Sequence, residues 1–188
     1  MDSRKKIIRK LQSTLSPRRY QHTLGVEKTA ISLAKHYKTC EEQASTAGLL
    51  HDCAKNIPYE VMREYCKSYK INLSEFKDFP QIVHSFLGAE IAEKEYNISD
   101  HNILNAIRYH TTGRSNMTLL EKIIFLSDYI EPGRKTFEGL QEVREMVYVD
   151  LDRAVYMTLN STIKYLLKMD VPIHPLTIDS EKYYRQLN

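Results

Sequence analysis

The chain has 188 residues, of which 42% are hydrophobic and 27% charged, and its formal net charge is only +3. This length fits one domain with a substantial core, and so small a charge does not argue for nucleic-acid binding. No segment approaches the ~18 apolar residues of a membrane span, and the basic N-terminus lacks the apolar stretch of a signal peptide. The cysteines Cys40, Cys53 and Cys66 show no CxxC spacing, which favours a reducing, cytoplasmic compartment over disulfides or a thiolate metal site.

The sequence predicts an all-α chain, because it has only six glycines and no Asn-Gly or Asp-Gly hairpin signal. The expected helices, in chain order, cover about residues 3–15, 16–37, 39–55, 58–69, 80–96, 99–110, 118–131, 138–148 and 151–169. Residues 71–79 form a looser stretch, and Pro172 and Pro175 break the C-terminal tail. We see no repeat or linker, so a single globular helical bundle is expected over residues 1–188.

Several helix starts carry recognisable cap signals. Ser16 followed by Pro17 fits an N-cap with proline at the first helical position. Residues 39–42 and 118–121 read as capping boxes, each a threonine followed by glutamate three residues later. Ser99 is the expected cap of the helix over 99–110. These signals fix where the histidines and aspartates fall on the helices.

The sharpest chemical signal is the pair His51-Asp52, which follows the apolar end of a helix. His22 precedes it, and His84, His110 and Asp128 follow. Nitrogen and oxygen donors without thiolate suit iron, manganese, zinc or magnesium. Asp128 lies in an otherwise apolar helix, where an unpaired buried carboxylate would cost several kcal/mol, so a metal ion is its expected partner. The alternative is that Asp128 is partly exposed and needs no such partner. His36 and His101 have no motif around them, and we regard them as ordinary surface or core residues.

Five segments resemble the YqeK family of the HD-domain phosphohydrolase superfamily: residues 19–26 (RYQHTLGV), 48–55 (GLLHDCAK), 84–89 (HSFLGA), 106–113 (AIRYHTTG) and 128–134 (DYIEPGR). The resemblance implies an all-α HD-domain helical bundle, with a metal-site core at about 16–135 and C-terminal helices and tail at about 138–188. The chain departs from the family after residues 173–177. It has Ser180-Glu181-Lys182 where the family tends to have Ala-Arg-Asn, which leaves the role of the tail open.

The resemblance also implies a metal site. His22, His51, Asp52 and Asp128 would hold an iron ion, or else manganese or another divalent transition metal. For His84 and His110 two alternatives stay open. They bind a second metal, with Asp52 as the bridge, or they face the substrate phosphates. We favour the phosphate contacts under ordinary conditions, with a second ion joining when metal is abundant.

Further residues are expected to act on the substrate. Lys55 and Arg134 would contact phosphate oxygens, unless Lys55 is a plain surface lysine and Arg134 pairs with Glu131. Thr111 would offer its hydroxyl, with capping of the preceding helix as the alternative. Asp52, His84, His110 and Lys55 are the expected catalytic residues. Further substrate contacts are assigned to the motif and tail residues Arg19, Asp128, Ile173, His174 and Pro175, and base contacts to Tyr20, Tyr109 or the 172–175 loop.

The activity that the resemblance implies is symmetrical hydrolysis of diadenosine tetraphosphate to two ADP. One alternative is an HD-type nucleotide or deoxynucleotide phosphohydrolase, which would use the same ligands. Another is a nucleotide sensor without turnover, which would have little need for an acidic metal site. The expected partners are a dinucleoside polyphosphate or purine nucleotide and a second copy of the chain in a homodimer, but neither membrane nor nucleic acid.

Overall fold

The computed structural model describes residues 3–187, and within them it contains ten α-helices, two short 3-10 helices and no strand. The elements in order are α1 Ser3–Thr14, α2 Pro17–His36, α3 Glu41–Leu50, α4 Tyr59–Ser68, η1 Leu73–Phe76, η2 Pro80–Ile82, α5 Val83–Tyr96, α6 His101–Tyr109, α7 Leu119–Ile130, α8 Leu140–Met146, α9 Leu151–Lys168 and α10 Pro175–Gln186. The all-α expectation is confirmed. In the described part of the chain, no helix is both long enough and apolar enough to cross a membrane.

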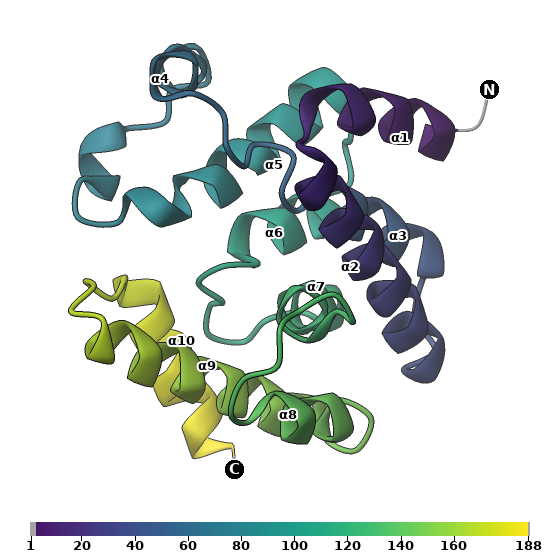
Figure 1. Cartoon of the computed structure of the whole chain (residues 1–188), viewed down its shortest axis with the longest axis vertical. Helices are drawn as coiled ribbons and strands as arrows, with labels where there is room; N and C mark the ends of the chain where they lie inside the picture. The colour runs from purple at the N-terminus through teal and green to yellow at the C-terminus, as the bar shows by residue number, and fades with distance from the viewer. Residues whose placement is uncertain (1–2, 188) are drawn as a thin grey trace.

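Helices α2, α3, α6 and α7 pack against one another at the centre of the molecule (Figure 1). Their shared core includes the fully buried side chains of Leu33, Leu50, Ile107, Ile124 and Leu126. Helix α5 covers α6, while α9 packs on α7 and carries α8 and α10. Each predicted metal-site residue lies on one of the four central helices or on α5, or directly after one of them, so the core packing brings these positions together.

Two of the predicted helix caps are confirmed. The Ser16 hydroxyl accepts a hydrogen bond from the Arg19 N–H at 3.4 Å, with Pro17 at the first helical position of α2. At α7 the Thr118 hydroxyl accepts from the Glu121 N–H, and the Glu121 carboxylate accepts from the Thr118 N–H at 2.7 Å. These two caps fix the starts of the helices that carry His22 and Asp128.

Two other cap predictions are wrong. Thr39 does not cap α3, because its N–H bonds back to the Ala34 carbonyl at 2.9 Å and so completes the end of α2. Cys40 is the cap residue of α3 and makes no side-chain cap bond. At α6 the cap is Asp100 and not Ser99, since its carboxylate accepts from the Asn102 N–H at 2.8 Å.

The C-terminal tail differs from expectation. Pro175 does not break it but opens α10, with the His174 ring accepting the Leu176 N–H as the cap. Proline is tolerated at a first helical position because the N–H it lacks would have no helical partner there. Helix α10 packs on α9, and its Tyr184 is fully buried, with its hydroxyl accepting the Met117 N–H at 2.9 Å. Residues 175–186 are therefore part of the fold.

Candidate metal centre

The four predicted first-metal ligands meet at one point. His22 comes from α2, His51 and Asp52 from the turn after α3, and Asp128 from α7. His22 Nε2 lies 3.0 Å from Asp128 Oδ1 and 3.9 Å from Asp52 Oδ2. His51 Nε2 lies 3.4 Å from Asp52 Oδ2 and 3.9 Å from Asp128 Oδ1. Two nitrogens and two carboxylate oxygens thus surround a small common space.

The orientation of each histidine is fixed through its other ring nitrogen. The Nδ1 atoms of His51, His84 and His110 lie 2.8, 2.8 and 2.7 Å from the carbonyl oxygen three residues earlier. A carbonyl oxygen only accepts, so each Nδ1 carries a hydrogen, and Nε2 is the ring nitrogen left to face a ligand. All three Nε2 atoms approach Asp52 within 3.2–3.6 Å. A shared local geometry therefore prepares these rings as ligands.

The donor set fits a transition metal. Bonds of about 2.1 Å set about 90–110° apart place neighbouring donors about 3.0–3.4 Å from each other, close to the separations among these four residues. In addition, Nε2 of His22 and Nε2 of His51 are buried and lack a hydrogen-bond partner among the described residues. Buried polar atoms are rarely left so, and a cation is the partner that two lone pairs beside two carboxylates require.

Asp52 faces two groups of residues with its two oxygens. Oδ2 points to His22 and His51, whereas Oδ1 lies 3.2 Å from His84 Nε2 and 3.6 Å from His110 Nε2. His84 and His110 approach each other to 3.3 Å through their Nε2 atoms. This arrangement gives Asp52 the geometry of a carboxylate shared between two cation positions.

The charged groups of the centre shift one another's pKa. Burial raises the pKa of Asp52, but the His51, His84 and His110 rings outweigh it and hold this pKa well below its usual range. The pKa of Asp128 is also lowered, because His22, His51 and Arg134 together outweigh burial. Burial lowers the pKa of His84 to about 4, with help from nearby His110 and Lys55. Both carboxylates are thus ionised and His84 is neutral at pH 7, the states that metal ligation needs.

The predicted cationic residues reach the same centre. Arg19 donates to Asp52 Oδ2 at 2.6 Å, and the Arg134 guanidinium donates to Asp128 Oδ1 and not to the Glu131 carboxylate. Lys55 Nζ lies 3.1 Å from His84 Nε2, so it is not a plain surface lysine. The Thr111 hydroxyl lies 3.1 Å from His110 Nε2 and 3.4 Å from His84 Nε2 instead of capping a helix.

The tail and tyrosine residues lie apart from these contacts. His174 packs against Phe79, with ring centroids 4.9 Å apart, and near Phe76 and Phe86, each at 6.5 Å. One face of the Tyr109 ring is covered by the Arg114 guanidinium, 5.3 Å from the ring centroid. For Ile173, Pro175 and Tyr20, the structure likewise records no polar contact with the centre among residues 3–187. Their roles in substrate binding stay predictions.

Glu131 is the residue that sequence reasoning missed. It is buried, and its Oε1 lies 3.0 Å from His22 Nδ1, while its Oε2 accepts the Gly133 N–H at 2.6 Å. A Cβ atom on Gly25 would lie only 2.6 Å from the same Oε2. A carboxylate that holds a metal-ligating histidine raises its basicity and fixes its tautomer. The signal in the sequence was the Glu131-Pro132-Gly133 motif, which we had regarded only as a family marker.

Comparisons with known proteins agree with this geometry. The HD domain family matches residues 19–133. A Halalkalibacterium halodurans protein named symmetrical bis(5'-nucleosyl)-tetraphosphatase is 41% identical over 98% of this chain and 97% of its own. A Bacillus subtilis protein of the same name is 38% identical over 93% of this chain and 94% of its own. A Clostridium acetobutylicum crystal structure, described as a predicted HD superfamily hydrolase involved in NAD metabolism, matches at TM-score 0.94 and 41% identity, covering all of both chains. The chain belongs to the HD domain family of metal-dependent phosphohydrolases, as its motifs led us to expect.

Proposed function

We propose that this protein hydrolyses diadenosine tetraphosphate symmetrically, giving two ADP. The observation that carries the proposal is the convergence of the His22 and His51 Nε2 atoms, both without a hydrogen-bond partner, on the ionised carboxylates of Asp52 and Asp128. The relatives of matching length that carry the tetraphosphatase name support the substrate. The proposal thus assigns one substrate and one position of cleavage to this metal-dependent phosphohydrolase.

We propose that His22, His51, Asp52 and Asp128 hold an iron ion, with manganese as the nearest substitute. When bound, such an ion supplies an activated water and polarises a phosphoryl oxygen. The Nδ1 atoms of His84 and His110 are taken up by backbone carbonyls, so their Nε2 atoms are the ones that can serve as ligands, which favours the second-metal alternative for these two residues. Asp52 would then be shared through Oδ1 and Oδ2.

The remaining polar residues act on the phosphates. Arg19 and Arg134 neutralise the ligand carboxylates in this structure, and each carries further N–H groups that fit phosphate oxygens. Lys55 lies beside His84, and its pKa is lowered by burial, although Asp52 partly offsets that effect. Arg19 contacts Asp52 Oδ2, whereas Lys55 lies against His84, which faces Asp52 Oδ1, so these two cations accompany different oxygens of Asp52. Charge stabilisation on both sides of one phosphorus favours cleavage in the middle of a long phosphate chain.

A nucleotide panel tests the substrate. Protein loaded with iron or manganese should hydrolyse diadenosine tetraphosphate without releasing inorganic phosphate from AMP, dAMP or other mononucleotides. Asp52→Ala should abolish turnover and lower the bound metal measured by elemental analysis. Phosphate release from a mononucleotide would favour the alternative nucleotide phosphohydrolase. Tight nucleotide binding without metal-dependent turnover would favour the sensor.

The compartment is also a proposal. The three cysteines are all free, with Cys53 and Cys66 buried and Cys40 exposed, a pattern that persists in reducing surroundings. We place the enzyme in the cytoplasm on this ground.

A further inference from the structure

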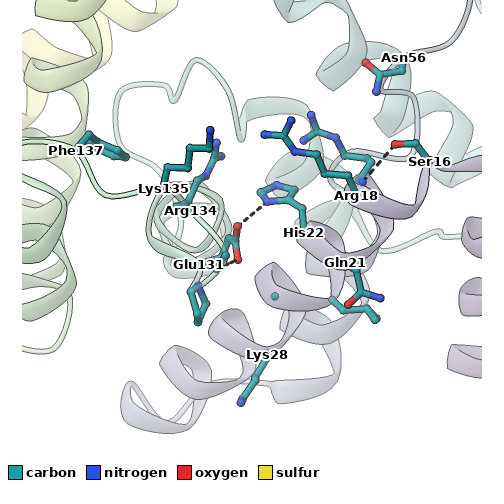
Figure 2. A pocket seen from close by; sticks show the side chains of 15 residues that line it. Ser16, Arg18, Gln21, His22, Lys28, Asn56, Glu131, Arg134, Lys135 and Phe137 are labelled. Carbon is teal, nitrogen blue, oxygen red and sulfur yellow. Dashed lines mark hydrogen bonds and ion pairs between the residues drawn. The ribbon is translucent and has the colours of Figure 1, made fainter.

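A large groove adjoins the metal centre on the side of His22. It has a volume of about 1050 Å³ and is lined by the first part of α2 with its cap Ser16, by Asn56 and by the segment 131–137 that follows α7. Figure 2 shows His22 and Glu131 at its base. This volume is at the upper end of ordinary ligand pockets and is sufficient for a nucleotide. The groove therefore continues the candidate active site and is not a separate cavity.

The groove is strongly cationic although the chain is nearly neutral. Its lining includes five cations and a single carboxylate, that of Glu131: the cations are Arg18, Arg19, Lys28, Arg134 and Lys135. Arg19 and Arg134 pair with the ligand carboxylates Asp52 and Asp128. The other three cations are exposed and form no ion pair with another described residue. Unpaired positive charge concentrated beside a phosphohydrolase centre attracts an extended polyanion.

An aromatic side chain lies at one end of the groove. Phe137 is 41% exposed, unusually open for a phenylalanine, and packs edge-on against Tyr129 with ring centroids 5.3 Å apart. A large part of the Phe137 ring is thus open to a stacking partner. Figure 2 shows Phe137 beyond Lys135 as seen from His22, while Arg18 lies near His22 on α2. The order of groups from the metal centre outward is cations first and an aromatic ring last, which matches the order of phosphates and base in a nucleotide.

We infer that this groove binds one nucleoside diphosphate half of the dinucleoside tetraphosphate. Arg18 and Lys135 contact its phosphates, and Phe137 stacks on its base. The inference rests on the proposed function and adds to it the residues that distinguish a dinucleoside substrate from a mononucleotide. The other half then lies on the side of Lys55 and Thr111.

Two substrates separate the phosphate contacts from the base contact. Diadenosine tetraphosphate has a nucleoside at both ends, whereas inorganic tetraphosphate has none and cannot make a base contact in either half of the site. Phe137→Leu keeps apolar bulk against Tyr129 but removes the stacking face. It should raise KM for the dinucleoside about 5-fold or more and leave kcat for it within about 2-fold. For inorganic tetraphosphate, which has no base to stack, the ratio of variant to wild-type kcat/KM should stay near one.

The cations are tested by the double variant Arg18→Ala/Lys135→Ala. It should raise KM for both substrates on the order of 10-fold and flatten the dependence of kcat/KM on salt. Lys67→Ala, which removes an exposed lysine on α4 away from the groove, is the matched control and should change neither. Thermal unfolding of each variant checks that the fold is kept.

The outcomes distinguish the two claims. If wild-type protein fails to hydrolyse diadenosine tetraphosphate, the proposed function is wrong. If wild type hydrolyses it, but the groove variants match Lys67→Ala in KM and salt dependence, the groove does not bind substrate. An equal loss for both substrates in Phe137→Leu would overturn the assignment of the base to Phe137.

Discussion

Carboxylates flank His22 on both sides of its ring: Asp128 Oδ1 lies 3.0 Å from Nε2, and Glu131 Oε1 lies 3.0 Å from Nδ1. Burial lowers its pKa, but the two carboxylates outweigh burial and raise it overall. The Nδ1 contact directs the Nε2 lone pair into the centre. Glu131 in turn is confined by Gly133, whose N–H it accepts, and by Gly25, where a side chain would collide with it.

Glu131→Gln should weaken metal binding on the order of 10- to 100-fold. Glutamine has one acceptor oxygen, so it cannot serve both the His22 ring and the Gly133 N–H. Titration against a chromophoric chelator measures the effect directly, without an activity assay. Glu138→Gln, an exposed neighbour in the same segment, is the control and should bind metal like wild type. Equal affinity in both variants would show that Glu131 does not position His22.

His84 gives a pH prediction for the metal-free protein. Its pKa falls from 6.5 to about 4 on folding, mainly because the ring is buried. Between these two values the unfolded chain takes up a proton that the folded protein does not, so stability falls as pH falls from 6.5 to 4. The difference between these two pKa values corresponds to a loss of roughly 3 kcal/mol in the free energy of unfolding. The raised pKa of His22 has an effect in a different pH range. It stabilises the folded protein below pH 6.5, and this stability is lost as the pH rises above 6.5.

Urea unfolding at pH 7 and pH 4.5 measures this loss. His84→Gln should reduce the difference between the two pH values, since it removes the titrating ring. A wild-type slope that persists unchanged in His84→Gln would assign the proton uptake to other groups.

The sequence predicted the residue types and not their contacts. The His51-Asp52 pair and the family motifs named every side chain that meets at the centre. The contacts of these side chains are known only from the structure, in which Arg134 pairs with Asp128 and Lys55 lies against His84. The role of Glu131 depends on an approach between α2 and the residue after α7, a contact that links residues 109 positions apart, so the local motif marks Glu131 but does not identify its partner.

Among the elements, the pair α2 and α3 is set by a close approach at Gly48. A Cβ atom there would lie 2.9 Å from the Glu27 Cα atom, which is backbone and cannot turn aside. The Gly48 carbonyl also accepts the hydrogen of His51 Nδ1. One glycine therefore couples the spacing of two helices to the orientation of a metal-ligating ring.

Gly48→Ala should cost about 1–3 kcal/mol in the free energy of unfolding, because the added methyl group overpacks the contact. It should also weaken metal binding by moving His51. Urea unfolding and metal titration measure the two effects. Gly88→Ala is the matched control, since its Cβ atom would meet neighbours at 3.4 Å or more. If the two variants were equally stable, the close approach would not limit the packing of α2 on α3.

Helix existence was easier to predict than helix ends. The caps at Ser16 and Thr118 were predictable because a side chain bonds the backbone only three residues away. The errors at Thr39 and Ser99 are each one residue long. In both cases two neighbouring polar residues could form the cap. At α3 the Thr39 N–H is bound by the end of the preceding helix, and at α6 the charged Asp100 carboxylate accepts the Asn102 N–H.

For the whole molecule, the all-α bundle followed from composition and periodicity, whereas the place of the tail did not. Helix α10 is held by Tyr184 against Met117, directly before the cap of α7, a contact across 67 positions. This packing supports our proposal that residues 138–187 fold with the metal-site core as one domain. The resemblance to the HD domain family supplied what periodicity cannot, namely which helix ends face each other.

The position of cleavage tests the central claim most directly. Metal-loaded protein is incubated with diadenosine tetraphosphate in ¹⁸O-labelled water, and early products are separated and weighed by mass spectrometry. Attack of water at one inner phosphorus, with the ADP that contains the other inner phosphate as the leaving group, predicts ADP alone, with one labelled oxygen in one of every two ADP molecules. ATP and AMP in equal amounts would contradict the account, because they would show that the centre does not face the middle of the phosphate chain.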